Sequence, residues 1–243
     1  MAQAEWTVLT DSLPTASVAR GVTSGIVKPN GGGNFVYGFN SLAIVNGAVG
    51  LHNNQVNFAP MASGGSVRGA VKRGASGGTS GFAPFLFIGL QGPSVNDIGY
   101  LLGLSDAEPA HISLRKGSIV TGLPDGGAVP AVSPNILMRS TETFENETWV
   151  HLRLDMIVQG TGDVLLQVFE SDLGANPVTA PVWLQIAGME GPQSPTIDGF
   201  VDDALGVNTG SAPLTSGRAG MGFRVQDVTR RGFFDHLEVA RQT

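Results

Sequence analysis

The chain of 243 residues contains no cysteine, which excludes disulfides, thiolate catalysis and cysteine-ligated zinc. Charged residues are also scarce, at 14% of the chain, and 20 Asp and Glu outnumber 14 Lys and Arg. A net charge of -6 with scattered cations argues against a nucleic-acid partner, because phosphate neutralisation needs clustered cations.

Long apolar runs are lacking as well. The strongest, FAPFLFIGL at 82–90, contains Pro84 and falls short of the roughly 18 to 20 residues of a membrane span. The N-terminus, MAQAEWTVLTDSLP, has no basic region followed by an apolar core, so it does not resemble a secretory signal. We therefore expect synthesis in the cytoplasm and no membrane partner.

No window has a sustained apolar period of about 3.6 residues, so we expect almost no helix beyond a short turn near 200–206. What the chain does contain is 35 Gly and 14 Pro, which are typical of strands joined by many turns. The clearest strand is WVHLRLDMIV at 149–158, in which apolar and polar residues alternate. The turn GTGD at 160–163 and the strand VLLQVFES at 164–171 complete an antiparallel hairpin.

The rest of the chain predicts further strands that are bounded by turn residues. They are 35–39, 42–51, 66–73, 83–90, 98–105, 110–122, 181–187, 219–226 and a closing strand within GFFDHLEV at 232–239. The Gly/Pro-rich stretch 123–135 could link two domains or form a long loop. Neither the strands before it nor those after it would form a closed sandwich, so we predict one domain, 1–243, of two packed antiparallel sheets.

The segment TWVHLRLDMIVQGTGDVLLQVFESD carries Trp149 at the start of its first strand, and SGRAGMGFRVQDVTRRGFFDHLEV ends in a strand carrying Phe234 and Asp235. These two segments of the second half resemble the concanavalin A-like and laminin G-like jelly rolls. The resemblance covers roughly 140–240 and implies an all-β jelly-roll sandwich. Lectins, glycosidases, adhesion modules and structural proteins of tailed-bacteriophage particles share this fold, so it leaves the function open.

The sequence contains no recognisable catalytic motif. Glycosidases of this fold carry several carboxylates on one strand face, typically Glu-x-Asp-x-x-Glu, and the chain has no such run. Glu142, Glu145 and Glu147 have the wrong spacing, so TETFENE is interpreted as a solvated turn. The four histidines lie far apart in the sequence, and no G-x-S-x-G elbow exists. We expect no catalytic residue and no enzymatic activity.

One acidic loop, TIDGFVDDALG, offers a weak metal hypothesis. Calcium binds six to eight oxygen ligands, and Asp198, Asp202 and Asp203 could supply some of them, although the EF-hand pattern is absent. A plain acidic loop is the favoured interpretation. No other cofactor is expected.

Aromatic side chains could form a platform for a sugar ring. We place Trp149 and Trp183 in the core, because each lies in an apolar strand, which leaves Trp6 as the candidate for carbohydrate binding.

Asp235 is the most unusual residue of the closing strand. Strict alternation would put it on one face with Phe233, Leu237 and Val239, that is, in an apolar row. A lone buried carboxylate is costly unless it is hydrogen-bonded. We predict a structural role, in which Asp235 accepts hydrogen bonds from backbone amides or from an arginine such as Arg224 or Arg153.

A cysteine-free β-sandwich of low charge, with Gly-rich runs at 31–33, 63–65 and 76–78, favours broad protein contacts. We expect a non-enzymatic virion structural protein of a tailed phage, in the head decoration, neck, tail or baseplate. It would contact copies of itself and other virion proteins. The alternative is a lectin-like carbohydrate-binding module, which could serve host adsorption.

Overall fold

The computed structural model describes residues 6–11, 18–23, 36–41, 45–53, 64–74, 82–92, 97–105, 109–119, 136–171, 182–186, 189–190, 199–205, 209, 211–228 and 231–241. In the first four strands only the backbone is described. The described residues form strands and turns without a helix, as the composition predicts, and none of them belongs to a helix that could cross a membrane.

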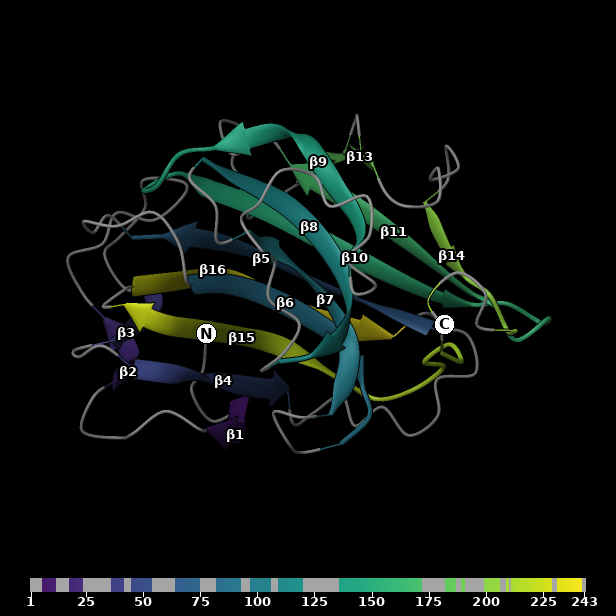
Figure 1. Ribbon diagram of the computed structural model, residues 1–243, viewed down its shortest axis with the longest axis horizontal. Coiled ribbons are helices and arrows are strands. Elements are labelled where there is room, and N and C mark those ends of the chain that lie inside the picture. The colour runs from purple at the N-terminus through teal and green to yellow at the C-terminus, as the bar shows by residue number, and fades with distance from the viewer. Residues whose placement is uncertain are drawn as a thin grey trace.

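Sheet A has eight strands in the order β1-β4-β15-β6-β7-β8-β9-β13, and all of its pairs are antiparallel (Figure 1). Its strands are β1 (Trp6–Asp11), β4 (Val45–Asn53), β6 (Phe82–Leu90), β7 (Ile98–Leu104), β8 (Ala110–Ser118), β9 (Ile136–Phe144), β13 (Met189–Glu190) and β15 (Arg218–Val228).

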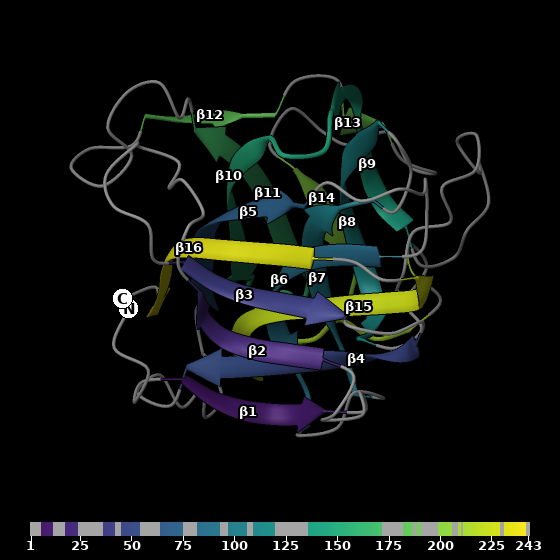
Figure 2. The ribbon, with the colours of Figure 1, turned by 90° about the vertical axis from the view of Figure 1, so that its left-hand side faces the viewer.

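Sheet B runs in the order β12-β11-β10-β5-β16-β3-β2, and β14 also pairs with β11. Its strands are β2 (Val18–Thr23), β3 (Val36–Ser41), β5 (Gly64–Arg73), β10 (Trp149–Val158), β11 (Val164–Ser171), β12 (Trp183–Gln185), β14 (Phe200–Asp202) and β16 (Arg231–Arg241). Figure 2 shows β3 between β16 and β2 at one end of this sheet. Both sheets combine strands from the two sides of the 123–135 stretch, which itself lies outside the described residues.

The core lies between the two sheets and is built by alternate residues of each strand. On β10, Val150, Leu152, Leu154 and Met156 are buried in it, and on β15 Met221 and Phe223 face them from the other layer. The predicted antiparallel hairpin of β10 and β11 is present, with a register that runs from His151 opposite Ser171 to Val158 opposite Val164. Period-2 alternation in the sequence therefore predicts the core face of this hairpin correctly.

Some elements differ from the sequence-based expectation. The short turn expected near 200–206 is found at 204–205, but residues 200–202 before it form strand β14, which pairs with β11. Five strands were not expected at all: β1, β2, β9, β13 and β14. The short strand β14 forms because folding places it beside β11. Such tertiary pairing overrides the local structural preference of the sequence.

The closing strand β16 contains a bulge that changes which residues face the core. Opposite β5, Asp235 pairs with Ala70 but Glu238 pairs with Arg68, so β16 uses one extra residue over this step. His236 adopts φ 51°, a left-handed conformation that marks the bulge. Because one added residue reverses the alternation, Phe234 faces the core before the bulge and Leu237 and Val239 face it afterwards.

The expected apolar row of Phe233, Asp235, Leu237 and Val239 is therefore wrong. Asp235 lies on the outer face of sheet B, opposite Ala70. It is 8% exposed, and its Oδ1 accepts a hydrogen bond of 2.9 Å from the backbone amide of His236. The predicted backbone donor is found, whereas the guanidinium of Arg153 binds Asp155 instead.

One buried ion pair fixes the loop after β14 against sheet A. Lys116 Nζ lies 2.6 Å from Asp202 Oδ2, and these side chains are 4% and 0% exposed. The same ammonium donates to Ser211 O at 2.9 Å and to Ala212 O at 2.8 Å. The Tyr100 hydroxyl donates to Asp202 Oδ2 at 2.5 Å. Burial first, and the charge of Asp202 second, raise the pKa of Tyr100, so the phenol stays protonated and acts as a donor.

Removing the cation of this pair should be costly. We expect Lys116→Met to lower the free energy of unfolding by about 3–5 kcal/mol, because Asp202 would remain buried without its counter-charge. Urea unfolding measures the loss. The double variant Lys116→Met/Asp202→Asn is the control and should recover part of it, since the amide carries no charge. A loss of under about 1 kcal/mol for Lys116→Met would contradict this account.

Candidate functional site

The outer face of sheet B presents aromatic and charged side chains in ordered rows, and we call it the aromatic–polar face. Its members come from five neighbouring strands and lie in register. They are Arg68 and Lys72 on β5, Trp149, His151, Arg153 and Asp155 on β10, Phe169 and Ser171 on β11, Trp183 and Gln185 on β12, and Phe233, Asp235, His236 and Glu238 on β16.

The first row places a cation between two aromatic rings. Lys72 pairs in register with Trp149 on one side and with Phe233 on the other. Its ammonium lies 5.3 Å from the Trp149 ring centroid and 5.2 Å from that of Phe233. It also binds Glu147 Oε2 at 2.8 Å. Lys72 is thereby held flat against the sheet, and the Trp149 ring remains partly exposed.

The second charged row pairs each cation with its own acid. Arg153 donates from Nε to Asp155 Oδ1 at 2.7 Å and lies 5.2 Å over the Phe169 ring. Arg68 and Glu238 form an ion pair across β5 and β16, with Arg68 Nε 3.1 Å from Glu238 Oε2. Together with Lys72 and Glu147, these pairs neutralise the three principal cations of the face.

Between these rows lies a histidine cluster. His151 is opposite Ala70, whose small side chain lets the rings of His151 and His236 approach to 6.4 Å between centroids. The Trp183 ring lies 4.7 Å from that of His151, at an angle of 57°. His236 Nε2 is 3.7 Å from Asp235 Oδ2.

The imidazole of His151 is buried without polar partners. Its residue is 2% exposed, and neither ring nitrogen has a hydrogen-bond partner in the structure. Burial first, then the charges of His236 and Arg68, lower the pKa of His151 from 6.5 to about 4. The ring is therefore neutral near pH 7.

The structure corrects the placement of two tryptophans. Trp149 and Trp183 were expected in the core, yet both are partly exposed and lie on the outer face of sheet B. Alternation could have shown this for Trp149, because it shares the odd-numbered row of His151, Arg153 and Asp155. The backbone of Trp6 is on edge strand β1 of sheet A, and its side chain lies outside the described residues.

The acidic candidates occupy other places. Both carboxylate oxygens of Asp202 accept from protein donors, Oδ2 from Tyr100 and Oδ1 from Thr209 at 2.8 Å. Asp203 follows β14, while Asp198 lies outside the described residues. Within the described part of the chain, no group of three or more His, Asp or Glu is placed to hold a metal ion. Calcium binding stays a prediction that this geometry does not support.

The turn before β10 agrees with its expected character. Glu142, Glu145 and Glu147 are all exposed, as interpreted from TETFENE, but Glu142 lies on strand β9, so only the second half of this segment forms the turn. Glu147 has φ 66° and carries the carboxylate that binds Lys72. This pairing could not be predicted from the sequence, because the two residues are far apart along the chain.

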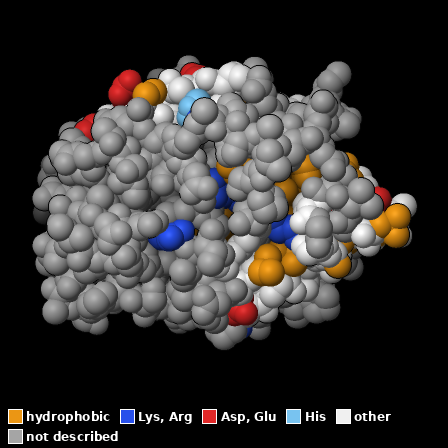
Figure 3. All heavy atoms as spheres, in the orientation of Figure 1, with side chains coloured by type: hydrophobic (Ala, Val, Ile, Leu, Met, Phe, Trp, Pro, Cys, Tyr) orange, Lys and Arg blue, Asp and Glu red, His pale blue; other side chains and the backbone are white. Residues whose placement is uncertain are grey.

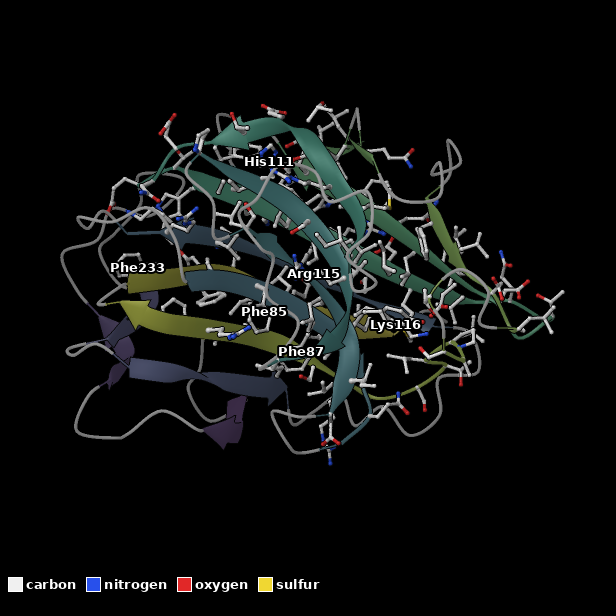
Figure 4. All side chains as sticks on the ribbon, viewed as in Figure 1. Phe85, Phe87, His111, Arg115, Lys116 and Phe233 are labelled. Atoms are coloured by element: carbon white, nitrogen blue, oxygen red, sulfur yellow. The ribbon has the colours of Figure 1, made fainter. Side chains whose placement is uncertain are left out.

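The outer face of sheet A differs from that of sheet B. Phe85, Phe87 and Leu101 form a second apolar cluster there, with Leu90 and Ile119. Figure 4 shows Phe85, Phe87 and Arg115 near one another over β6–β8, and hydrophobic and basic side chains are visible in a hollow of that face in Figure 3. The cluster and Arg115 are at most 5% exposed, so they offer a ligand almost no surface in this conformation.

Comparisons with known proteins identify the fold. No protein-family model matches the chain, and no curated sequence matches it. Among solved structures, the marine PL-14 alginate lyase from Aplysia kurodai is similar over 93% of this chain and 88% of its own, with 10% identity and a TM-score of 0.51.

Two carbohydrate-binding proteins are also similar in structure. The carbohydrate-binding module CBM66 from Bacillus subtilis has 12% identity and a TM-score of 0.47, covering 97% of this chain and 95% of its own. The carbohydrate recognition domain of Emp46p has 10% identity and a TM-score of 0.48, covering 99% and 89%. The architecture is an antiparallel β-sandwich consistent with a jelly-roll fold, and these likenesses carry no information about a ligand of this chain.

Buried His151 should make stability depend on pH. Between pH 6.5 and about 4 the unfolded chain binds a proton at this position and the folded chain does not, so stability falls as the pH falls through that window and levels off below it. We expect the contribution to reach at most about 3 kcal/mol. Thermal unfolding of the wild type and of His151→Phe at several pH values measures it. Other titrating groups affect both proteins alike, so identical pH profiles would contradict the assignment.

Proposed function

We propose that this protein is a non-enzymatic carbohydrate-binding module whose ligand lies across the aromatic–polar face. The observation that carries the proposal is the outward orientation of Trp149 and Trp183 within a ladder of fixed polar groups. An outer face of a sandwich sheet is ordinarily polar and solvated. Partly exposed indole rings on that face are well suited to stack against the apolar face of a pyranose.

The polar groups beside the rings are suited to bind sugar hydroxyls. Arg153, Asp155 and Glu238 are oriented by ion pairs rather than free to rotate, so they lose little entropy when a ligand binds. Gln185 on edge strand β12 pairs with Phe169 on β11 and has an exposed side-chain amide, so it extends the face to that edge. The face spans five adjacent strands, at roughly 4.8 Å per strand, which gives space for several sugar units.

The charge distribution supports a neutral glycan. Lys72, Arg68 and Arg153 each have a carboxylate partner, so an anionic sugar would have to displace an existing ion pair. A neutral glycan can add hydrogen bonds to these groups without breaking them.

The expected role in a tailed-phage particle finds no support in the comparisons. Self-association, virion partners and localisation in a particle remain predictions, and an adsorption role on such a particle would be compatible with glycan binding. Light scattering and the genomic neighbourhood would test those expectations separately from the ligand.

Substitution of the two partly exposed tryptophans tests the proposed function. We expect a glycan array to show binding to neutral glycans, and Trp149→Ala or Trp183→Ala to weaken the binding by about 30-fold or more, as for aromatic anchors at other interfaces. Titration calorimetry measures the affinities. Trp6→Ala is the matched control, because Trp6 lies on the edge strand of the other sheet, and it should bind like the wild type. Loss of binding only in the Trp6 variant would place the site elsewhere and overturn this assignment.

A further inference from the structure

The unexplained feature of the aromatic–polar face is the histidine at its centre. His151 is 2% exposed, and both of its ring nitrogens lack hydrogen-bond partners. Buried polar atoms are nearly always satisfied, and an unmade hydrogen bond lowers stability. A phenylalanine would place a flat ring of similar shape here without that penalty. Folding alone therefore gives no reason for an imidazole at this position.

The residues packed around His151 define the candidate subsite. Trp183 covers the ring from β12, and His236 approaches it from the bulge of β16. Ala70 forms the floor, because it is the register partner of both His151 and Asp235. The Asp235 carboxylate is held by the His236 amide at the far side.

Access to the subsite can come through strand β12. This strand has three residues and pairs only with β11 among the described strands. The two apolar side chains that flank Trp183 are largely in solvent and anchor the strand weakly, since Val182 is 64% and Leu184 57% exposed. Short, weakly buried edge elements open at low cost in free energy. Displacement of Trp183 from the His151 ring would uncover the two imidazole nitrogens.

We propose that His151 is the hydrogen-bonding residue of a hydroxyl subsite, which a neutral sugar enters by displacing the Trp183 ring. The inference rests on the proposed carbohydrate function and names the residue that would select the ligand. A neutral imidazole has one donor and one acceptor nitrogen. Adjacent sugar hydroxyls, each of which donates and accepts, match that pair. Trp183, once displaced, remains beside the sugar as its stacking partner.

The test separates a binding role of His151 from a structural one. His151→Phe should raise the melting temperature by about 2–4 °C, because the unsatisfied nitrogens are gone. The same variant should bind the best neutral glycan of the array about 10-fold more weakly, since the ligand hydroxyls lose their partner. His151→Asn keeps a donor and an acceptor and should bind more tightly than His151→Phe. Calorimetry and thermal unfolding give both readouts on the full chain.

The outcomes are distinct. If His151→Phe lowers the melting temperature, or binds as tightly as the wild type while Trp149→Ala does not, the subsite is wrong and the proposed function stands. If His151→Asn is no better than His151→Phe, hydrogen bonding by this residue is also refuted. If the wild type binds no neutral glycan, the proposed function fails and the subsite fails with it.

Discussion

The register between β5 and β16 is the constraint on which the face of sheet B depends. The extra residue at the His236 bulge reverses the alternation of β16, so that Phe233 and Asp235 point outward while Leu237 and Val239 point inward. Gly69 leaves room for the inward Leu237 side chain after the bulge, because a β-carbon there would lie 2.6 Å from Leu237 Cδ2. With strict alternation, a strand that kept Asp235 opposite Ala70 would place Leu237 opposite Arg68, so the outer face would lose its pairing of Glu238 with Arg68.

The same bulge explains why a carboxylate could be tolerated in an apolar-looking strand. Asp235 precedes a residue at φ 51°, and its Oδ1 binds the amide of that residue. A short polar side chain that bonds to its own neighbouring backbone is typical of positions where a strand departs from regular geometry. The acid therefore stabilises the bulge locally, and the bulge in turn brings His236 to the centre of the face, beside His151.

The sequence predicts those strands whose buried and exposed faces are visible in their own alternation of apolar and polar residues. Alternation predicts β10, β11 and their hairpin, since each second residue faces the same core. The bulge could not be predicted, because a left-handed histidine has no sequence signal of the kind that glycine provides. The proximity of His151 and His236 is also a product of topology: β5 is inserted between their two strands. The error on Trp149 was avoidable, since alternation already assigns it to the outer row.

Two buried polar sites of the sandwich are satisfied to opposite degrees. Lys116 and Asp202 are almost completely satisfied by each other, by Tyr100 and by loop carbonyls, so that site stabilises one loop conformation and leaves no capacity for a ligand. His151 is equally buried and has no such partners. Stability is commonly lower where a protein keeps groups ready for binding. This contrast between the two sites favours the outer face of sheet B as the place where a ligand binds.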